Sequence, residues 1–160
     1  MTSPVTYEPA TPDDVDALVE LRIEAMRESL ERIGRFDPAR ARERFASSFD
    51  PAYTRHILAN GQRVGFLVVK PQAEGLLLDH LYLRPAQQGQ GIGGRVLAGL
   101  LADADARHLP VHVGALRESA SNAFYVRHGF HQVGESEWDI FYRRDPLTSA
   151  RRSSKTAAHQ

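Results

Sequence analysis

Apolar residues in the first fifty positions recur at two different spacings, and each spacing predicts one kind of element. The short run from Val5 to Tyr7 has the residue types of a β-strand. Thr11 and Pro12 then supply a helix cap and a first helical residue, and apolar side chains follow at intervals of three and four. This pattern predicts a helix to about Ser29, with a buried face made of Val15, Leu18, Val19, Leu21, Ala25 and Met26.

Residues that favour caps and turns mark the boundaries of the next elements. Gly34 ends the helical pattern, and Asp37-Pro38 starts a second helix that continues to about Ser48. Two strand-like runs, 55–59 and 63–70, then flank Asn60-Gly61. Because this dipeptide accepts positive φ at both central positions of a type I′ turn, it predicts a β-hairpin.

The rest of the chain continues the alternation of strands and helices. The predicted elements are a turn at 71–75, strand 76–83, helix 95–106, strand 111–116, helix 119–128 ended by Gly129, and a closing hairpin of strands 130–133 and 138–143. After Pro146 the apolar periodicity stops, and residues 148–160 read as a disordered polar and basic tail. We therefore expect one domain over 1–147, with a mixed α/β sheet.

Composition excludes several classes of protein. The 160 residues carry a formal net charge of zero, so nothing favours nucleic acid or an anionic membrane as a partner. The absence of cysteine excludes disulfides, thiolate catalysis and cysteine metal sites, and the histidines lack metal-ligand spacing, so we expect no metal. Without a membrane-length apolar stretch or a signal-peptide pattern, the chain is expected to be cytoplasmic.

A glycine-rich turn after strand 76–83 is the most informative stretch. Arg84-Pro85 leads into four glycines within six residues, Gly89, Gly91, Gly93 and Gly94, and an amphipathic helix follows at once. Such glycines leave backbone N–H groups uncovered, and the positive end of the helix dipole adds to their effect. The stretch therefore predicts a binding loop for phosphate or pyrophosphate.

Two motifs overlap in this loop. Residues 89–94 match G-x-G-x-x-G, the dinucleotide-binding pattern, which needs an acidic residue about 20 positions on and further βαβ units. The next strand, 111–116, ends without a carboxylate, so this alternative is disfavoured. Gln88, Gly91 and Gly93 also match Q/R-x-x-G-x-G/A, and from about Val5 to Asp145 the chain resembles the GCN5-related N-acetyltransferases.

The resemblance implies a fold and a coenzyme site. The fold is the acyl-CoA N-acyltransferase fold, a mixed, mostly antiparallel sheet of six to seven strands with helices on both faces. The loop would hold the pyrophosphate of acetyl-coenzyme A (acetyl-CoA), and the backbone of the strand before it would pair with the pantetheine arm and polarise the thioester carbonyl. The residues so assigned are Leu81, Tyr82, Leu83, Gln88, Gly89, Gln90, Gly91, Ile92, Gly93, Gly94, Ser119, Asn122 and Tyr125.

A second stretch, residues 116–130, supports the same resemblance. Many family members open this helix with a small polar residue or Asn and continue with a Phe/Leu-Tyr dipeptide and Gly-Phe; here Ser119 stands at the opening and Asn122 one turn later. Tyr125 is the predicted general acid that protonates the departing coenzyme A sulfur. The alternative is a buried tyrosine that packs beside Phe124.

The acceptor amine must lose a proton before it attacks. A lysine-like amine has a pKa of about 10.4 and an α-amine about 8, so the nucleophile arrives mostly protonated. His80 and Asp79, just before the loop, are the candidate bases; strand alternation places them on opposite faces, and a histidine is expected to titrate near neutrality. The alternatives are a structural histidine and an aspartate that pairs with a neighbouring arginine.

In the resembled family the first two helices and their connection form a wall of the acceptor site. Glu24, Arg35, Phe36 and Arg40 are accordingly the predicted substrate-binding residues, with Glu24 also a further candidate base. A wall rich in arginine would favour a substrate that carries a carboxylate or a phosphate. The alternative is a basic face that only contacts water.

Together these patterns predict an acetyl-CoA-dependent N-acetyltransferase in which a primary amine attacks the thioester directly. The acceptor would be a small-molecule amine or a peptide amine, and a homodimer is compatible with the family. The rival hypothesis is a catalytically silent sensor module that binds acyl-CoA and has no acceptor.

Overall fold

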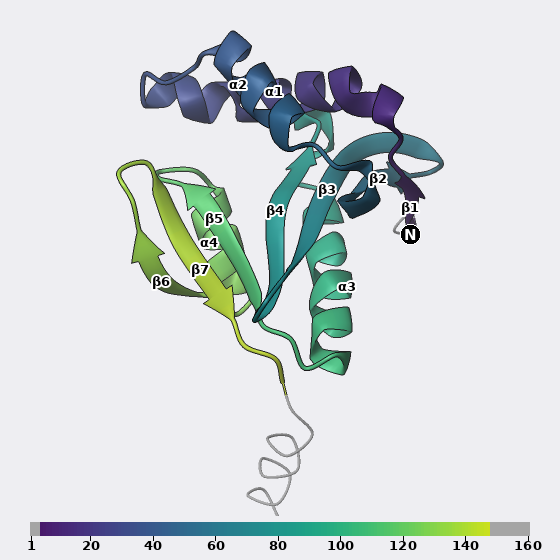
Figure 1. Ribbon diagram of the computed structural model, residues 1–160, viewed down its shortest axis with the longest axis vertical. Coiled ribbons are helices and arrows are strands. Elements are labelled where there is room, and N and C mark those ends of the chain that lie inside the picture. The colour runs from purple at the N-terminus through teal and green to yellow at the C-terminus, as the bar shows by residue number, and fades with distance from the viewer. Residues whose placement is uncertain (1–3, 148–160) are drawn as a thin grey trace, which may run out of the picture. The chain divides into compact units, whose positions relative to one another are not determined.

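The structure is a computed structural model that describes residues 4–147, so the tail predicted at 148–160 lies outside the described residues. The described chain forms two compact units: unit 1 runs to Lys70 and includes Leu78–Val96, and unit 2 contains Pro71–Leu77 and the chain from Leu97 onward. Seven strands follow the order β1-β2-β3-β4-β5-β7-β6 in the sheet (Figure 1). The pairs with a defined register are antiparallel. The predicted mixed α/β fold is confirmed.

The described chain contains β-strands, α-helices and short 3-10 helices, which carry the label η. In order they are β1 (Val5–Pro9), η1 (Pro12–Asp14), α1 (Val15–Arg32), α2 (Pro38–Ser48), η2 (Pro51–Tyr53), β2 (Thr54–Ala59), β3 (Gln62–Gln72), β4 (Gly75–Leu83), η3 (Pro85–Gln87), α3 (Ile92–Ala106), β5 (Val111–Leu116), α4 (Ser121–Arg127), β6 (His131–Glu135) and β7 (Asp139–Arg144). The unit boundaries fall within β3, β4 and α3. Among the described residues, no helix is long and apolar enough to span a membrane.

The turn between β2 and β3 confirms the predicted hairpin. Asn60 and Gly61 have φ angles of 54° and 74°, and they join a register in which Ala59 faces Gln62. Both residue types tolerate the left-handed region that a type I′ turn requires. The local sequence therefore determines the register of β2 and β3 next to this turn.

Helix boundaries differ from the predictions where the first turn is unusual. A capping box between Thr11 and Asp14 leads into a 3-10 turn, so α1 begins at Val15 and not at Pro12. Conversely, α3 begins at Ile92, three residues before the predicted start, and the N–H of Arg95 donates to the carbonyl of Gly91 over 3.1 Å. Glycine has poor helix propensity, which is why the pattern alone favoured a later start. The predicted helix 119–128 is likewise shorter, since α4 covers Ser121–Arg127.

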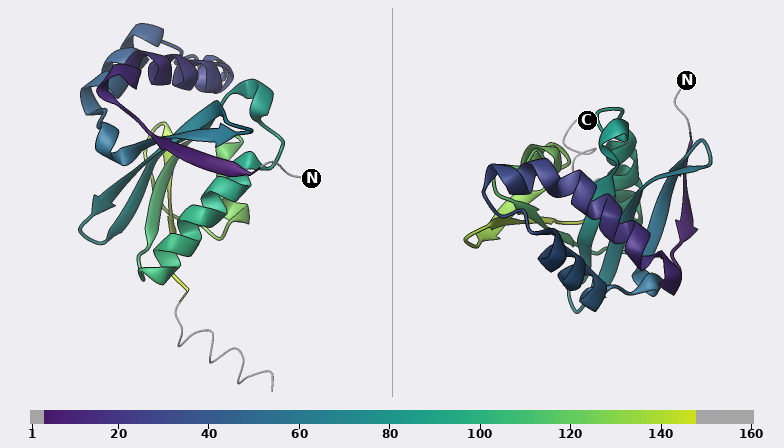
Figure 2. Two further views of the ribbon diagram at one scale, coloured as in Figure 1. Left: turned by 90° about the vertical axis from the view of Figure 1, so that its right-hand side faces the viewer. Right: turned by 90° about the horizontal axis from the view of Figure 1, so that it is seen from above.

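Both faces of the unit 1 sheet are covered by helices. On one face Leu18 and Val19 of α1 and Phe45 of α2 pack with Phe66 of β3 and Tyr82 of β4. On the other face the first residues of α3, Ile92 and Val96, pack with other strand residues, namely Ile57, Leu67, Leu81 and Leu83. Figure 2 shows α1 and α2 lying together above β3 and β4. Ile23 is also buried, a position that the predicted helix face lacked.

A buried histidine connects η1 to β2. His56 is 3% exposed, and its Nε2 lies 2.9 Å from Oδ2 of Asp14, whose other oxygen lies 3.6 Å from Arg63. The hydrogen bond from His56, together with the one from the Thr11 N–H, lowers the pKa of Asp14 below its ordinary value of 3.8. His56 therefore has a structural role for which the sequence pattern gave no signal.

The Asp14 contact predicts a loss of stability in acid. A carboxyl whose pKa is lower in the folded state stabilises that state at pH values above its unfolded pKa. That contribution should disappear as the pH falls through the folded pKa, below 3.8. Urea unfolding from pH 6 down to pH 2.5 should show a shallower decline for Asp14→Asn than for wild type, whereas Asp13→Asn, at an exposed neighbour, should keep the wild-type slope. Equal slopes in all three proteins would contradict the assignment.

In unit 2, one ion pair holds the end of the described chain. Asp105 of α3 accepts hydrogen bonds from both terminal nitrogens of Arg144 at 2.8 and 3.1 Å, and from the N–H of Leu147 at 2.9 Å. The two side chains are only 11% and 12% exposed. Because water cannot replace the lost partner of a buried charge, this pair is costly to break.

We predict that Asp105→Ala lowers the free energy of unfolding by about 3 kcal/mol. The matched control is Asp103→Ala on the same helix, where the pair with Arg107 is more than half exposed and contributes under about 0.5 kcal/mol. Chemical denaturation of both variants measures the difference. Equal losses of unfolding free energy in the two variants would show that the buried Asp105–Arg144 pair stabilises the fold no more than an exposed pair.

Candidate active site

The glycine loop of unit 1, residues 88–94, has an unusual backbone conformation. Gly89 and Gly91 have φ angles of 78° and 80°, and a Cβ built at either position would meet no atom within 4 Å. In the described chain, the turn and cap hydrogen bonds use no backbone N–H between Gly89 and Gly94 as a donor. Together with the start of α3 at Ile92, these donors form an electropositive main-chain surface that fits a diphosphate.

The side chains of two glutamines, Gln88 and Gln90, hold this loop in its conformation. The amide of Gln88 donates to the carbonyl of Leu83 over 3.1 Å, and the amide of Gln90 donates to the carbonyl of Ala86 over 3.2 Å. The motif glutamine therefore attaches the loop to the last residue of β4. Both glutamines hold the backbone conformation and leave its N–H groups available.

The residue opposite the last part of β4 was missed by sequence reasoning. A Cβ on Gly65 of β3 would lie 2.2 Å from the carbonyl oxygen of Tyr82, so only glycine fits there. Beside it the N–H of Arg84 donates to the carbonyl of Val64 over 2.9 Å. Gly65 thus lets β3 approach the segment Leu81, Tyr82 and Leu83, whose backbone is assigned to the pantetheine arm.

His80 lies among aromatic rings on the face of unit 1 that α1 and α2 cover. Its ring centroid is 5.2 Å from that of Phe45 and 5.5 Å from that of Tyr82, and its Nδ1 is 3.2 Å from the Tyr82 hydroxyl. The pKa of His80 is lowered to about 4, chiefly by burial; Asp79 opposes this shift, and the positive charges of Arg22 and Lys70 add to it. The expectation that this histidine titrates near neutrality is therefore wrong, because the helices desolvate its ring.

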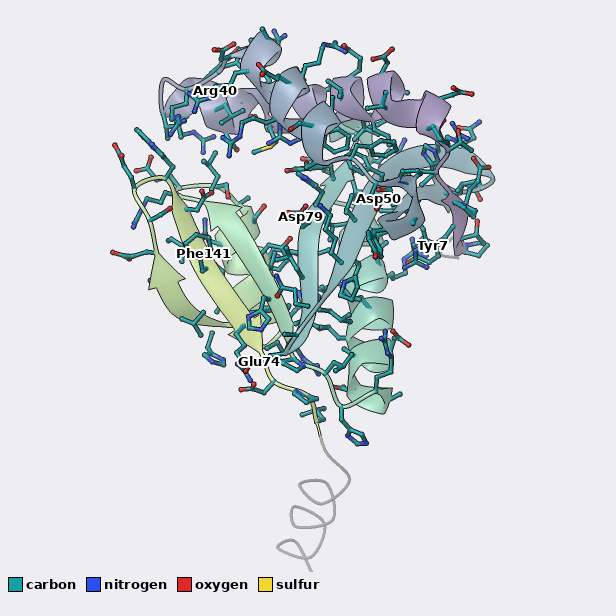
Figure 3. All side chains as sticks on the ribbon, viewed as in Figure 1. Tyr7, Arg40, Asp50, Glu74, Asp79 and Phe141 are labelled. Atoms are coloured by element: carbon teal, nitrogen blue, oxygen red, sulfur yellow. The ribbon has the colours of Figure 1, made fainter. Side chains whose placement is uncertain are left out.

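Asp79 lies at the edge of the same cluster on β4 (Figure 3). Its Oδ2 is 3.1 Å from Nζ of Lys70 and 3.7 Å from Nε2 of His80. The ion pair that the sequence suggested is present, but its partner is a lysine. The two candidate bases are thus neighbours despite strand alternation, since the carboxylate, about one third exposed, reaches back to the imidazole.

In unit 2, Tyr125 of α4 is buried, with 6% of its surface exposed. Its ring packs against those of Phe124, Phe130 and Tyr142, with centroid distances of 5.3, 5.4 and 6.5 Å. This packing fixes the ring, as both a structural tyrosine and a positioned proton donor require. Its assignment as the general acid stays a prediction.

Asn122 and Ser119 organise the start of α4. The Asn122 amide donates to the carbonyls of Leu116 and Ser119 at 2.9 and 3.0 Å, and its oxygen accepts a hydrogen bond of 2.8 Å from the Tyr142 hydroxyl. Asn122 therefore ties α4 to β5 and β7. A contact of Ser119 or Asn122 with the coenzyme stays a prediction.

The predicted acceptor-site residues lie on or between α1 and α2 of unit 1. Glu24 is exposed on α1, with its carboxylate 4.0 Å from Arg84. Phe36 is half-buried beneath the guanidinium of Arg27, 4.7 Å from the ring centroid, and Arg40 is exposed on α2 (Figure 3). The structure adds Arg22, which sequence reasoning did not single out; its guanidinium carbon lies 6.0 Å from the Tyr82 ring centroid. Among the described residues, no group of three or more possible ligands could hold a metal ion.

Comparison with known proteins identifies the family. The model of the acetyltransferase (GNAT) domain matches residues 52–132, which include the glycine loop and Tyr125. The chain therefore belongs to the GNAT family, the GCN5-related N-acetyltransferases. No curated protein sequence matches it.

Solved structures agree with the fold. The PaiA N-acetyltransferase from Thermoplasma acidophilum, in complex with coenzyme A, aligns with a TM-score of 0.71 over 89% of this chain and 99% of its own, at 15% identity. The ribosomal-protein-S18-alanine N-acetyltransferase from Escherichia coli gives 0.67 over 91% and 97%, at 17% identity. An acetyltransferase from Thermus thermophilus gives 0.69 over 91% and 99%, at 21% identity. These likenesses confirm the acyl-CoA N-acyltransferase fold.

Proposed function

We propose that this protein is an acetyl-CoA-dependent N-acetyltransferase that transfers the acetyl group directly to a primary amine. Family membership supports acetyl transfer in general. The observation that carries the coenzyme assignment is the glycine loop, where positive φ at Gly89 and Gly91 coincides with open space beside each residue. Residues 88–94 would bind the diphosphate through main-chain N–H groups, which suit a doubly charged anion.

In the proposed reaction the amine nitrogen attacks the thioester carbonyl and the carbon–sulfur bond breaks. The developing oxyanion needs a hydrogen-bond donor, for which we assign a backbone N–H in the segment Leu81 to Leu83. The departing thiolate needs a proton, for which we assign the Tyr125 hydroxyl. The amide product and free coenzyme A then leave, and Tyr125 regains its proton from solvent.

The proton of the attacking amine would leave through two side chains of β4, His80 and Asp79. His80 is neutral at physiological pH because burial holds its pKa at about 4, so it can relay a proton but does not retain one. The Tyr82 hydroxyl lies 3.2 Å from one ring nitrogen, and Asp79 lies 3.7 Å from the other. We therefore assign His80 as the relay and Asp79, which is partly exposed, as the group that passes the proton to water.

A thiol-release assay over a panel of amines tests this function. The panel contains amino acids, polyamines, aminoglycosides and peptides with free N-termini, and each is mixed with acetyl-CoA while isothermal titration measures coenzyme binding separately. Release of free coenzyme A that depends on one amine class, with the N-acetyl product seen by mass spectrometry, is the expected result. Binding of acetyl-CoA without turnover on any amine would favour the silent sensor module, and no binding would reject the assignment.

A further inference from the structure

One arginine of unit 1 has a buried donor without a partner. Arg22 projects from α1, and its Nε is fully buried yet makes no hydrogen bond to any described residue. Its guanidinium carbon lies 6.0 Å from the Tyr82 ring centroid, on the face that also holds His80. Because a buried donor that lacks an acceptor destabilises a fold, such a group calls for a functional explanation.

The charge of Arg22 is also uncompensated within the described chain. The carboxylates near it in the sequence have other partners, since Glu20 pairs with Arg42 and Glu24 lies 4.0 Å from Arg84. On β4, the carboxylate of Asp79 pairs with Lys70 at 3.1 Å. Arg22 itself takes part in no ion pair between described residues. A partly buried guanidinium of this kind is suited to an anion supplied from outside the chain.

The surroundings of Arg22 would strengthen such a contact. Near it on this face lie the ring of Tyr82 and the neutral imidazole of His80, neither of which carries a compensating charge. The charge of Arg22 is felt at His80, where it adds to the lowering of the histidine pKa that burial begins. In a poorly solvated site a charged hydrogen bond contributes more than it does on the surface.

Arg22 is better placed for this task than Arg40 and Arg42 of α2. Arg40 is exposed on α2, where water screens its charge, and Arg42 is already paired with Asp16 and Glu20. Arg22, by contrast, extends from α1 to the same strand that carries the proposed proton relay. These contacts favour Arg22 over Arg40 and Arg42 as the residue that would hold an anion.

We propose that Arg22 binds an oxyanion of the acceptor, so that the substrate is an amine that also carries a carboxylate or a phosphate. This inference rests on the proposed function, because it names the acceptor of the same site. The planar guanidinium can hold either group through N–H donors on its two terminal nitrogens. Polyamines and other amines without an anionic group would be poor acceptors.

The first test observes Arg22 directly and needs no turnover. In the full-length ¹⁵N-labelled protein, the Arg22 Nε–H resonance is assigned by its loss in Arg22→Lys. Glycine, β-alanine, 4-aminobutyrate and phosphoethanolamine are titrated in, each against a counterpart without the anion, the amino amides and ethanolamine. At least one anionic amine should shift this resonance while its counterpart does not. Comparing the amino acids with phosphoethanolamine then shows whether Arg22 binds a carboxylate or a phosphate. Equal shifts within every pair, or no shift with any anionic amine, would overturn the proposal.

The second test compares initial rates in the thiol-release assay. For wild type, kcat/KM for the preferred anionic amine should exceed that for its neutral counterpart by about 10-fold to 100-fold. Arg22→Met should bring this ratio near one, mainly through KM, whereas Arg22→Lys should retain part of it. The matched control is Arg27→Met, which removes an exposed arginine that stacks on Phe36 of the same unit and should keep the wild-type ratio.

The outcomes separate this inference from the proposed function. A wild-type ratio that survives in Arg22→Met, even with a lowered melting temperature, would show a packing role and overturn the inference. Equal rates on anionic and neutral amines would overturn it while the acetyltransferase function stands. If no amine releases coenzyme A, the proposed function fails, and the resonance shift of Arg22 still decides whether this arginine binds the anion.

Discussion

Gly91→Val should weaken acetyl-CoA binding by at least about 100-fold, equivalent to about 2.7 kcal/mol. A β-branched residue disfavours the φ angle of 80° that Gly91 adopts, so the loop backbone would reorient its N–H groups. Its side chain would also fill the open space that we assign to the diphosphate. Losing two charge-assisted hydrogen bonds is enough to account for this magnitude. Isothermal titration with acetyl-CoA measures the change.

Gly61 provides a closely matched control for this substitution. It lies in the β2–β3 turn of the same unit, with a φ angle of 74° and no atom within 4 Å of its Cβ position. Gly61→Val should therefore lower thermal stability by a similar amount, because the backbone strain is similar, and leave coenzyme affinity within about threefold. If Gly61→Val weakens binding as much as Gly91→Val, the effect is global destabilisation and the loop assignment loses its support.

Tyr125→Phe should lower kcat by about 100-fold to 10,000-fold while the acetyl-CoA dissociation constant changes little. The substitution keeps the ring that packs on Phe124, Phe130 and Tyr142 and removes only the hydroxyl. Without a proton donor, the coenzyme A thiolate is a poorer leaving group, so the loss should fall on the chemical step. Steady-state rates on the preferred amine, together with titration of the coenzyme, separate the two quantities.

Tyr142→Phe tests whether any buried hydroxyl in this core would have the same effect. The Tyr142 hydroxyl donates to Asn122 over 2.8 Å, so its loss should cost about 1 kcal/mol of stability and little turnover. A Tyr125→Phe enzyme that works at the wild-type rate would remove Tyr125 from its role. Equal losses in the two variants would indicate a structural contribution instead.

Local sequence rules predicted the elements whose signals lie within a few residues. The Asn60-Gly61 turn, the cap and proline that start α2, and the strand Val111–Leu116 all agree with the structure, because each depends on neighbouring residues alone. The start of α3 was placed too late, since the poor helix propensity of glycine concealed the first turn of the helix. The glycines of the motif do form a turn with positive φ angles directly before this helix.

The parts of the site that sequence reasoning missed depend on contacts between distant segments. Arg22 meets Tyr82 sixty positions later, and Gly65 is required by the carbonyl of Tyr82 on the adjacent strand. The pKa of His80 depends on burial by helices that precede it in the chain. No local spacing encodes these distances, so a pattern can name a histidine as a base but cannot predict how far it is desolvated.

The most direct test of the central claim is a crystal structure of the protein with coenzyme A. We expect diphosphate oxygens to lie about 3 Å from backbone nitrogens between residues 89 and 94, at the first turn of α3. A diphosphate bound elsewhere on the chain, with this loop making no contact to it, would contradict the account.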